Sequence, residues 1–264
     1  MLSTRYVAGA PTWVDLGTPD LDGVHDFYRA LFGWEFHSGG AEFGGYGTYQ
    51  ADGKTVAGAM TVPADQAPPA WTIYFKTTDA DATVKAVQQA GGSMVYEPMD
   101  VGDLGRMAVL DDAQGVGFAV WQPGTNKGLD LVDAPNSMCW SELYTPDMKA
   151  ALEFYGSVFG WGTTTQAFDG GSYTMVHPAG GTENDMFGGL WPLSDAPEEV
   201  EAGPYWTPYF QVADIDAVLA EVEPAGGTVR VGRMDLAGVG SFAKLADPAG
   251  ARFALMQPEA PGGA

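Results

Sequence analysis

The nonapeptide DFYRALFGW at Asp26–Trp34 returns later in the chain as EFYGSVFGW at Glu153–Trp161. Each copy follows a related octapeptide, WVDLGTPD at Trp13–Asp20 and WSELYTPD at Trp140–Asp147. An internal repeat on this scale indicates that the chain consists of two copies of one module.

The repeat continues to the end of each copy and shows where the copies differ in length. They are 127 residues apart at the first motifs and 135 apart at DAQGVGFAVWQP (Asp112–Pro123) and DPAGARFALMQP (Asp247–Pro258). The second copy therefore carries an eight-residue insertion around residues 178–206. We expect two tandem modules, residues 1–124 and 135–264, joined by a polar linker over residues 125–134. They are expected to form one folded unit, because strands of one module can pair with strands of the other.

Local patterns predict the same elements in both copies. Trp13–Thr18 alternates as a strand does, and Asp20 is a good N-cap for a helix. Apolar residues at helical spacing then predict a helix over Leu21–Phe32 that Gly33 ends. A second helix is predicted over Asp79–Gly91, among further short strands cut by glycine. The expected fold is α+β, with helices on one face of a mainly antiparallel sheet.

Composition excludes several classes of function. Acidic residues outnumber basic ones 34 to 12, giving a formal charge of −22, which argues against nucleic acid and anionic membranes as partners. Hydrophobic residues make up 45 %, enough for a sizeable core. The single cysteine, Cys139, is expected to be a buried, unreactive thiol in a strand. No signal-type or membrane-spanning apolar run is present, so a cytoplasmic protein is expected.

The motif D-x-x-x-x-x-x-F-Y-x-x-x-F-G-W after a strand, closed by D-x-x-G-x-x-F, resembles the glyoxalase/bleomycin-resistance/dioxygenase group, the vicinal oxygen chelate superfamily. The resemblance covers nearly the whole chain, and its tandem form is most similar to two-module actinobacterial members, including Streptomyces proteins labelled hydroxylases or resistance proteins. It implies two βαβββ-type modules whose curved, mainly antiparallel sheets surround a ligand cavity.

The same resemblance implies where a metal would bind. In metal-using members, one ligand lies on the first strand, seven residues before the capping Asp, and another is a Glu four residues after the glycine of the last motif. The corresponding positions in this chain are Trp13, Trp140, Ala119 and Ala254. None of these side chains can ligate a divalent ion. We therefore predict no metal and no other cofactor, although a metal held by relocated carboxylates is an open alternative.

Aromatic and acidic residues are predicted to line the cavity instead. Trp13 and Asp15 share a strand face, as do Trp140 and Glu142 by the repeat. Other candidates for a ligand-binding wall on neighbouring strands are Tyr46, Trp71, Tyr74, Tyr173, Met175, Trp206 and Tyr209. Any one of these aromatic residues can equally belong to the core. Asp15 and Glu142 are harder to assign to a core, because a buried carboxylate needs a hydrogen-bond partner, water or a chemical role.

Three functions remain open from the sequence. The first is a binding protein for a small aromatic molecule, with or without a positive charge, such as an antibiotic or polyketide-like metabolite. The second is a cofactor-poor enzyme, hydroxylase- or lyase-like, that uses Asp15 or Glu142 as the acid or base. The third is a methylglyoxal glyoxalase, which the ligand positions disfavour. Either a monomer or a homodimer is expected.

Overall fold

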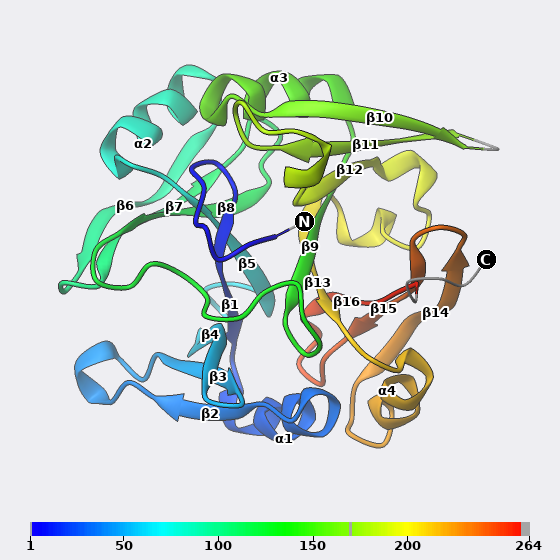
Figure 1. The fold of residues 1–264 in the computed structure, drawn as a ribbon. Coiled ribbons are helices and arrows are strands. Elements are labelled where there is room, and N and C mark those ends of the chain that lie inside the picture. Colours follow the sequence, from blue (N-terminus) through cyan, green and yellow to red (C-terminus); the bar gives the residue numbers. More distant parts are fainter. Residues whose placement is uncertain (1, 169–170, 260–264) are drawn as a thin grey trace. The chain divides into compact units, whose positions relative to one another are not determined.

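The computed structural model describes residues 2–168 and 171–259. In this part of the chain, both repeats show one order of helices and strands (Figure 1). The first repeat contains β1 (Pro11–Thr18), α1 (Leu21–Phe32), β2 (Glu35–Ser38), β3 (Gly47–Ala51), β4 (Lys54–Thr61), β5 (Ala70–Lys76), α2 (Ala80–Gln89), β6 (Ser93–Val101), β7 (Gly105–Asp111) and β8 (Gly117–Pro123). The second contains β9 (Met138–Thr145), α3 (Met148–Phe159), β10 (Gly162–Phe168), β11 (Gly171–His177), β12 (Gly188–Pro192), β13 (Tyr205–Gln211), α4 (Ile215–Val222), β14 (Thr228–Leu236), β15 (Gly240–Ala246) and β16 (Arg252–Pro258).

Each repeat thus holds two successive βαβββ motifs. The strand order is β2-β3-β4-β1-β5-β8-β7-β6 in one eight-stranded sheet and β10-β11-β12-β9-β13-β16-β15-β14 in the other. Pairing is parallel between β1 and β4, β5 and β8, β9 and β12, and β13 and β16, and antiparallel within each run of sequential strands. The predicted α+β fold with mainly antiparallel sheets is confirmed.

The first helix begins and ends where the sequence predicts. Asp20 accepts a hydrogen bond from the Gly23 backbone N–H at 2.9 Å, which satisfies one free donor of the first turn. Gly33 ends α1 in the left-handed region, at φ 68°, where a residue without Cβ is favoured. The glycine of the F-G-W motif thus ends the helix. The Trp34 ring of the same motif stacks on the Tyr28 ring, with 5.6 Å between the ring centroids.

Residue contacts divide the chain into two compact units, and each unit draws on both repeats. Unit 1 comprises residues 1–13, 72–128 and 140–207, and unit 2 comprises residues 14–71, 129–139 and 208–264. Unit 1 therefore contains α2 and α3, which pack against each other (Figure 1), and unit 2 contains α1 and α4, which do the same. The compact units are not the same divisions of the chain as the sequence repeats.

Aromatic side chains fill the core of each unit. In unit 1 the rings in mutual contact are Phe75, Phe118, Phe154, Tyr155, Phe159, Trp161, Phe187 and Trp206. In unit 2 they are Phe27, Tyr28, Phe32, Trp34, Tyr49, Trp71, Phe210 and Phe253. Both sets combine residues from the two repeats, so burial of these rings stabilises the association of the repeats.

A buried hydrogen-bonded triad lies inside each core. In unit 1, the Trp206 indole donates to Tyr155 Oη at 2.9 Å, and Tyr155 Oη donates to Asp112 at 3.1 Å. Asp112 also accepts the backbone N–H groups of Gln114 and Val116 in its own turn. In unit 2, Trp71, Tyr28 and Asp247 make the equivalent contacts at 3.2 and 3.0 Å. The repeated Tyr, Trp and Asp of the sequence motifs are therefore structural residues.

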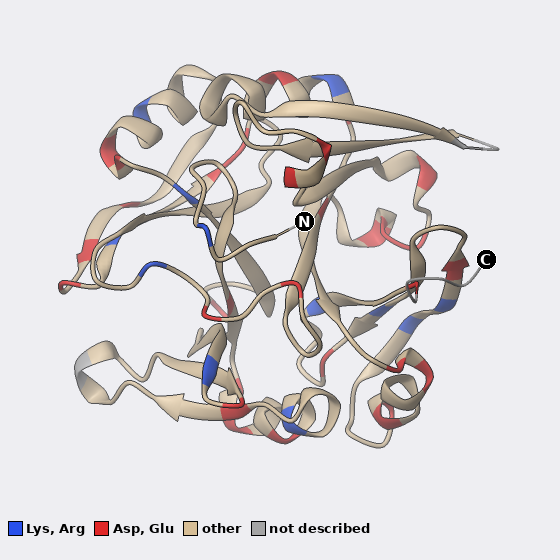
Figure 2. Ribbon diagram, viewed as in Figure 1, with Lys and Arg blue, Asp and Glu red and all other residues tan. Residues whose placement is uncertain are grey.

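Acidic side chains are distributed over helices and loops, with few basic ones among them (Figure 2). Arg106 is held by Asp81 at 2.9 Å and by Asp100 at 3.0 Å, and its repeat counterpart Arg233 is held by Asp216 and Asp235. Across residues 2–168 and 171–259, no helix is long and apolar enough to cross a membrane.

Candidate functional site

One face of β9 carries Trp140, Glu142 and Tyr144, since alternate residues of a strand point the same way. Glu142 is buried, with 8 % of its surface exposed. One of its carboxylate oxygens accepts the Tyr144 hydroxyl, and the other accepts the Tyr173 hydroxyl at 2.8 Å. The Trp140 indole donates to the same Tyr173 oxygen at 3.0 Å. The predicted residues Trp140, Glu142 and Tyr173 are therefore brought together in unit 1.

The position of Tyr173 depends on glycine in the neighbouring strand. Glu142 is the register partner of Gly189 on β12, and Tyr173 comes from β11. A Cβ atom at Gly189 would overlap the Tyr173 hydroxyl. The Trp191 ring, also on β12, lies 5.6 Å from that of Tyr173. Burial of the phenol and the adjacent Glu142 charge both raise the pKa of Tyr173 well above its ordinary value, so it is a hydrogen-bond donor at neutral pH.

The insertion of the second repeat brings a second carboxylate to this group. Glu199, fully buried, lies between two short 3₁₀ turns and accepts the Tyr205 hydroxyl at 2.6 Å. The Tyr205 ring lies 5.4 Å from that of Tyr144. We call the seven residues Trp140, Glu142, Tyr144, Tyr173, Trp191, Glu199 and Tyr205 the acid–aromatic cluster.

The first repeat reproduces part of this arrangement in unit 2. Tyr46 Oη donates to Asp15 at 3.1 Å, over the same separation of 31 residues as Tyr173 and Glu142. Asp15 is buried. The register pair Tyr144 and Trp191 of the second repeat corresponds to Gly17 and Met60 in the first. The two repeats share one tryptophan, the acid and one phenol, which are Trp13, Asp15 and Tyr46 in the first and Trp140, Glu142 and Tyr173 in the second. The other aromatic rings of the cluster belong to the second repeat.

The structure places the other predicted ligand-binding residues in different surroundings. Trp71 and Trp206 lie in the aromatic cores, hydrogen-bonded to Tyr28 and Tyr155. Trp13 is buried on β1. Met175 is half-buried on β11 and shares the face of Tyr173. Tyr74 is the register partner of Ala119, and Tyr209 is the register partner of Ala254.

The residues at the expected metal-ligand positions do not fit a divalent ion. Indole and methyl groups at Trp13, Trp140, Ala119 and Ala254 offer no donor atom. Among the described residues, no group of three or more His, Cys, Asp or Glu side chains is placed to hold a metal. No step of the function proposed below therefore runs through a metal ion.

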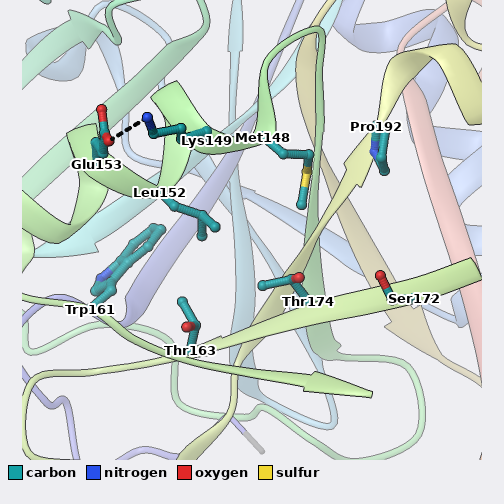
Figure 3. Close-up of a pocket in the computed structure, with 9 residues that line it drawn as sticks. All are labelled: Met148, Lys149, Leu152, Glu153, Trp161, Thr163, Ser172, Thr174 and Pro192. Carbon is teal, nitrogen blue, oxygen red and sulfur yellow. Dashed lines mark ion pairs between the residues drawn. The ribbon is translucent and has the colours of Figure 1, made fainter. Parts of the chain in front are cut away.

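A separate cavity of about 590 Å³ lies between α3 and β10–β11 in unit 1 (Figure 3). Leu152 and Trp161 face Thr163 and Thr174 across it, and an ion pair between Lys149 and Glu153 lies on the helix. Ser172 and Thr174 line this cavity, whereas Tyr173 between them joins the acid–aromatic cluster. The cavity and the cluster therefore lie on opposite faces of β11.

Cys139 has no part in the chemistry of this site. Its thiol is buried and lies 3.5 Å from the Tyr209 carbonyl oxygen, away from the hydrogen bonds of Glu142. Burial raises the pKa of the thiol far above its ordinary value, which keeps it protonated and unreactive. The predicted buried thiol is confirmed.

The sequence did not identify four members of the cluster. Tyr144 lies two residues after Glu142 and could have been found by strand alternation alone. Trp191, Glu199 and Tyr205 lie in or beside the insertion, where the repeats differ, and the first repeat has Met60 and Ala70 at the places of Trp191 and Tyr205. The only sign in the sequence that candidate site residues lie here was the difference between the two repeats at this insertion.

Comparison with known proteins agrees with this fold. The family model of the glyoxalase/bleomycin resistance protein/dioxygenase superfamily matches residues 10–120 and 137–255. The chain is 36 % identical to the anthracycline biosynthesis protein DnrV of Streptomyces peucetius, over 99 % of both chains. It is 34 % identical to CFP32 of Mycobacterium tuberculosis, over 97 % of both.

Solved structures with low sequence identity show the same fold. The Mn(II)-bound glyoxalase from Novosphingobium aromaticivorans matches with a TM-score of 0.65 and 16 % identity, covering 95 % of this chain and 82 % of that one. The resemblance to two-module actinobacterial proteins inferred from the repeated motifs is confirmed. The chain belongs to the glyoxalase/bleomycin resistance protein/dioxygenase superfamily.

Proposed function

We propose that this protein binds a hydroxylated aromatic small molecule of the polyketide type at the acid–aromatic cluster. The observation that carries the proposal is the contact of Glu142 with the hydroxyls of Tyr144 and Tyr173. A carboxylate that accepts two phenols from the protein is chemically suited to accept a phenol from a ligand.

The surrounding rings support an aromatic ligand. Half-buried side chains of Trp140, Tyr173, Trp191 and Tyr205 surround the buried Glu142. Large rigid rings with a few placed polar groups are typical of small-molecule sites, and flat polycyclic ligands stack on them. The net charge of −22 favours neutral or cationic ligands over anionic ones.

The names of two relatives support an aromatic polyketide as the ligand. DnrV of Streptomyces peucetius and DauV of a Streptomyces strain, each 36 % identical to this chain, are named anthracycline biosynthesis proteins. Anthracyclines are hydroxylated aromatic polyketides, which is the chemistry that the cluster would accept. A role in the synthesis of, or resistance to, such a compound is therefore the biological setting we propose.

Native mass spectrometry of the full chain, purified without chelators, tests this proposal. Adding quinizarin, a dihydroxyanthraquinone, is expected to produce a stoichiometric adduct, with no transition metal in either species. Failure to retain quinizarin at concentrations far above that of the protein would contradict the proposal. A stoichiometric metal in the purified protein would contradict the prediction that this chain binds no metal.

A second candidate function is acid–base catalysis on the same ligand. The contacts Tyr144–Glu142–Tyr173 place two phenols on one carboxylate, an arrangement through which a proton can pass between a ligand hydroxyl or carbon acid and the protein. Glu142 would accept the proton, and the phenols would orient the carboxylate.

Turnover distinguishes the enzyme from the binding protein. For an enzyme, Glu142→Gln is expected to lower kcat by about 100-fold or more, because the proton acceptor is lost. For a binding protein, incubation with quinizarin-type ligands returns them chemically unchanged, as followed by liquid chromatography. Chemical change that persists at full rate in Glu142→Gln would exclude Glu142 as the base.

A further inference from the structure

The hydroxyl of Thr207 on β13 is buried and has no hydrogen-bond partner among the described residues. The Thr207 side chain is 2 % exposed, and within residues 2–168 and 171–259 its Oγ1 is the one buried side-chain oxygen or nitrogen without a hydrogen-bond partner. A buried hydroxyl is nearly always paired, because removing it from water without compensation costs free energy. The hydrogen-bonding capacity of this hydroxyl is therefore available to a bound molecule.

The position of Thr207 connects it with the acid–aromatic cluster. Residues two apart on a strand point to one face, so Thr207 shares the face of Tyr205. The intervening Trp206 points to the opposite face, into the aromatic core around Tyr155. Tyr205 in turn contacts Tyr144 and donates to Glu199. The unpaired hydroxyl therefore lies on the cluster face of β13, deeper in the protein than half-buried Tyr205.

Two phenol hydroxyls of the acid–aromatic cluster are already donated to carboxylates. Tyr144 donates to Glu142, and Tyr205 donates to Glu199. Each phenolic hydrogen has thus been used, whereas Thr207 can both donate and accept. An oxygen atom of a ligand that stacks on the cluster would complete the hydrogen bonding of Thr207.

The first repeat provides a natural comparison. Thr72 occupies the corresponding place on β5, before Ile73 and after Trp71, but it is half-buried rather than buried. The counterpart of Tyr205 there is Ala70, which is exposed. Threonine occurs at this strand position in both repeats, and its hydroxyl is buried without a partner only beside the acid–aromatic cluster.

We propose that Thr207 is a specificity-determining residue of the second repeat, which hydrogen-bonds a carbonyl or hydroxyl oxygen of the bound aromatic ligand. This inference rests on the proposed function. It adds that an oxygen atom of the ligand is recognised and that the ligand binds to the second repeat. Quinones and hydroxyquinones carry such an oxygen, and aromatic ligands without oxygen do not.

Isothermal titration calorimetry of the full chain with quinizarin, and with the oxygen-free tricycle acridine, tests the inference. Thr207→Val keeps the shape of the side chain and removes the hydroxyl. It is expected to weaken quinizarin binding about tenfold, or about 1.4 kcal/mol, and to leave acridine binding unchanged. Thr207→Ser retains the hydroxyl and should retain quinizarin affinity, whereas Thr72→Val is the matched control that should bind both probes as the unaltered protein does.

The melting temperature of the unliganded protein gives a second readout that a merely structural threonine would not produce. Because Thr207→Val removes an unpaired buried hydroxyl, its Tm is expected to rise by about 2–4 °C. Unchanged quinizarin affinity in a folded Thr207→Val protein, or a lower Tm with unchanged affinity, would overturn the inference while the proposed function stands. Absence of quinizarin binding by the unaltered protein would overturn both.

Discussion

Phenol–carboxylate contacts occur in this protein in two settings, and the difference between them separates structure from function. Tyr155 with Asp112, and Tyr28 with Asp247, are fully enclosed in aromatic cores and also bind a tryptophan indole. Tyr173 with Glu142 lies among half-buried rings instead. The same pair of groups therefore stabilises the fold in the first setting and forms a candidate ligand contact in the second.

Removing the core phenols should reduce stability by similar amounts in the two units. In Tyr155→Phe and Tyr28→Phe, a buried carboxylate oxygen and a buried indole N–H each lose their partner. Each change is expected to lower the free energy of unfolding by about 1–3 kcal/mol. Urea denaturation measures the effect, and Tyr96→Phe at a site that is 61 % exposed is the control. Unchanged unfolding of both core variants would contradict the structural role.

The buried carboxylates should make stability depend on pH in an unusual direction. Desolvation raises the pKa of Asp112 above its ordinary value of 3.8, despite the loop amides and the phenol that lower it. A folded state that holds the proton more tightly than the unfolded state loses stability as the pH rises from 3.8 through the raised pKa.

Asp112→Asn removes that titration. The free energy of unfolding of Asp112→Asn, minus that of the unaltered protein, is therefore expected to increase as the pH rises through this window. Urea midpoints measured in steps from pH 3.8 upward check the prediction, with the exposed Glu201→Gln as the control for loss of a negative charge. A difference between the proteins that stays constant or falls with rising pH would refute it.

At the scale of single elements, a glycine in β12 allows the candidate site to form. Gly189 leaves the space that the Tyr173 hydroxyl occupies beside Glu142. Glycine weakens a strand, so its presence in the middle of β12 has a packing reason.

Gly189→Ala is expected to displace Tyr173 and to weaken quinizarin binding at least tenfold, because the contact with Glu142 is lost. The control is Gly156→Ala in α3, where a Cβ would meet nothing and should stabilise the helix by about 0.5–1 kcal/mol. Calorimetric titration measures the affinity, and thermal unfolding confirms that both variants fold. Equal affinity in the two variants would show that the position of Tyr173 is unimportant for binding.

Local patterns predicted elements well where one short segment contains all the determinants. The limits of α1 follow from Asp20 and Gly33, and strand alternation identified Glu142 with Trp140. Local patterns could not predict that Trp206 lies in the aromatic core, because its position there depends on contacts with Tyr155, 51 residues away in the chain. Glu199 could not be predicted either, since the burial of a charged residue in an insertion is determined by tertiary packing.

At the scale of the whole molecule, each compact unit combines segments of both repeats. Asp112 of the first repeat accepts Tyr155 of the second, and Tyr28 of the first donates to Asp247 of the second. A chain cut between the repeats would keep every residue of each module but would divide both triads and both aromatic cores.

Residues 1–128 and 129–264, produced as separate chains, are therefore expected to be unfolded or self-associated when alone and to form a heterodimer when refolded together. Size-exclusion chromatography with circular dichroism checks this outcome. A cooperatively folded, monomeric fragment 1–128 would contradict the view that the interleaved units carry the stability. The uncut chain, refolded in the same way, is the control.

The most direct measurement is a calorimetric titration of quinizarin into the unaltered protein and into the Glu142→Gln and Glu201→Gln variants. Glu201 is an exposed carboxylate close to Glu199 in sequence, so its variant controls for the loss of charge. We predict saturable binding by the unaltered protein, an affinity at least tenfold lower in Glu142→Gln because a hydrogen bond to a carboxylate is lost, and no change in Glu201→Gln. Equal affinities in all three proteins would show that the ligand does not bind at the acid–aromatic cluster.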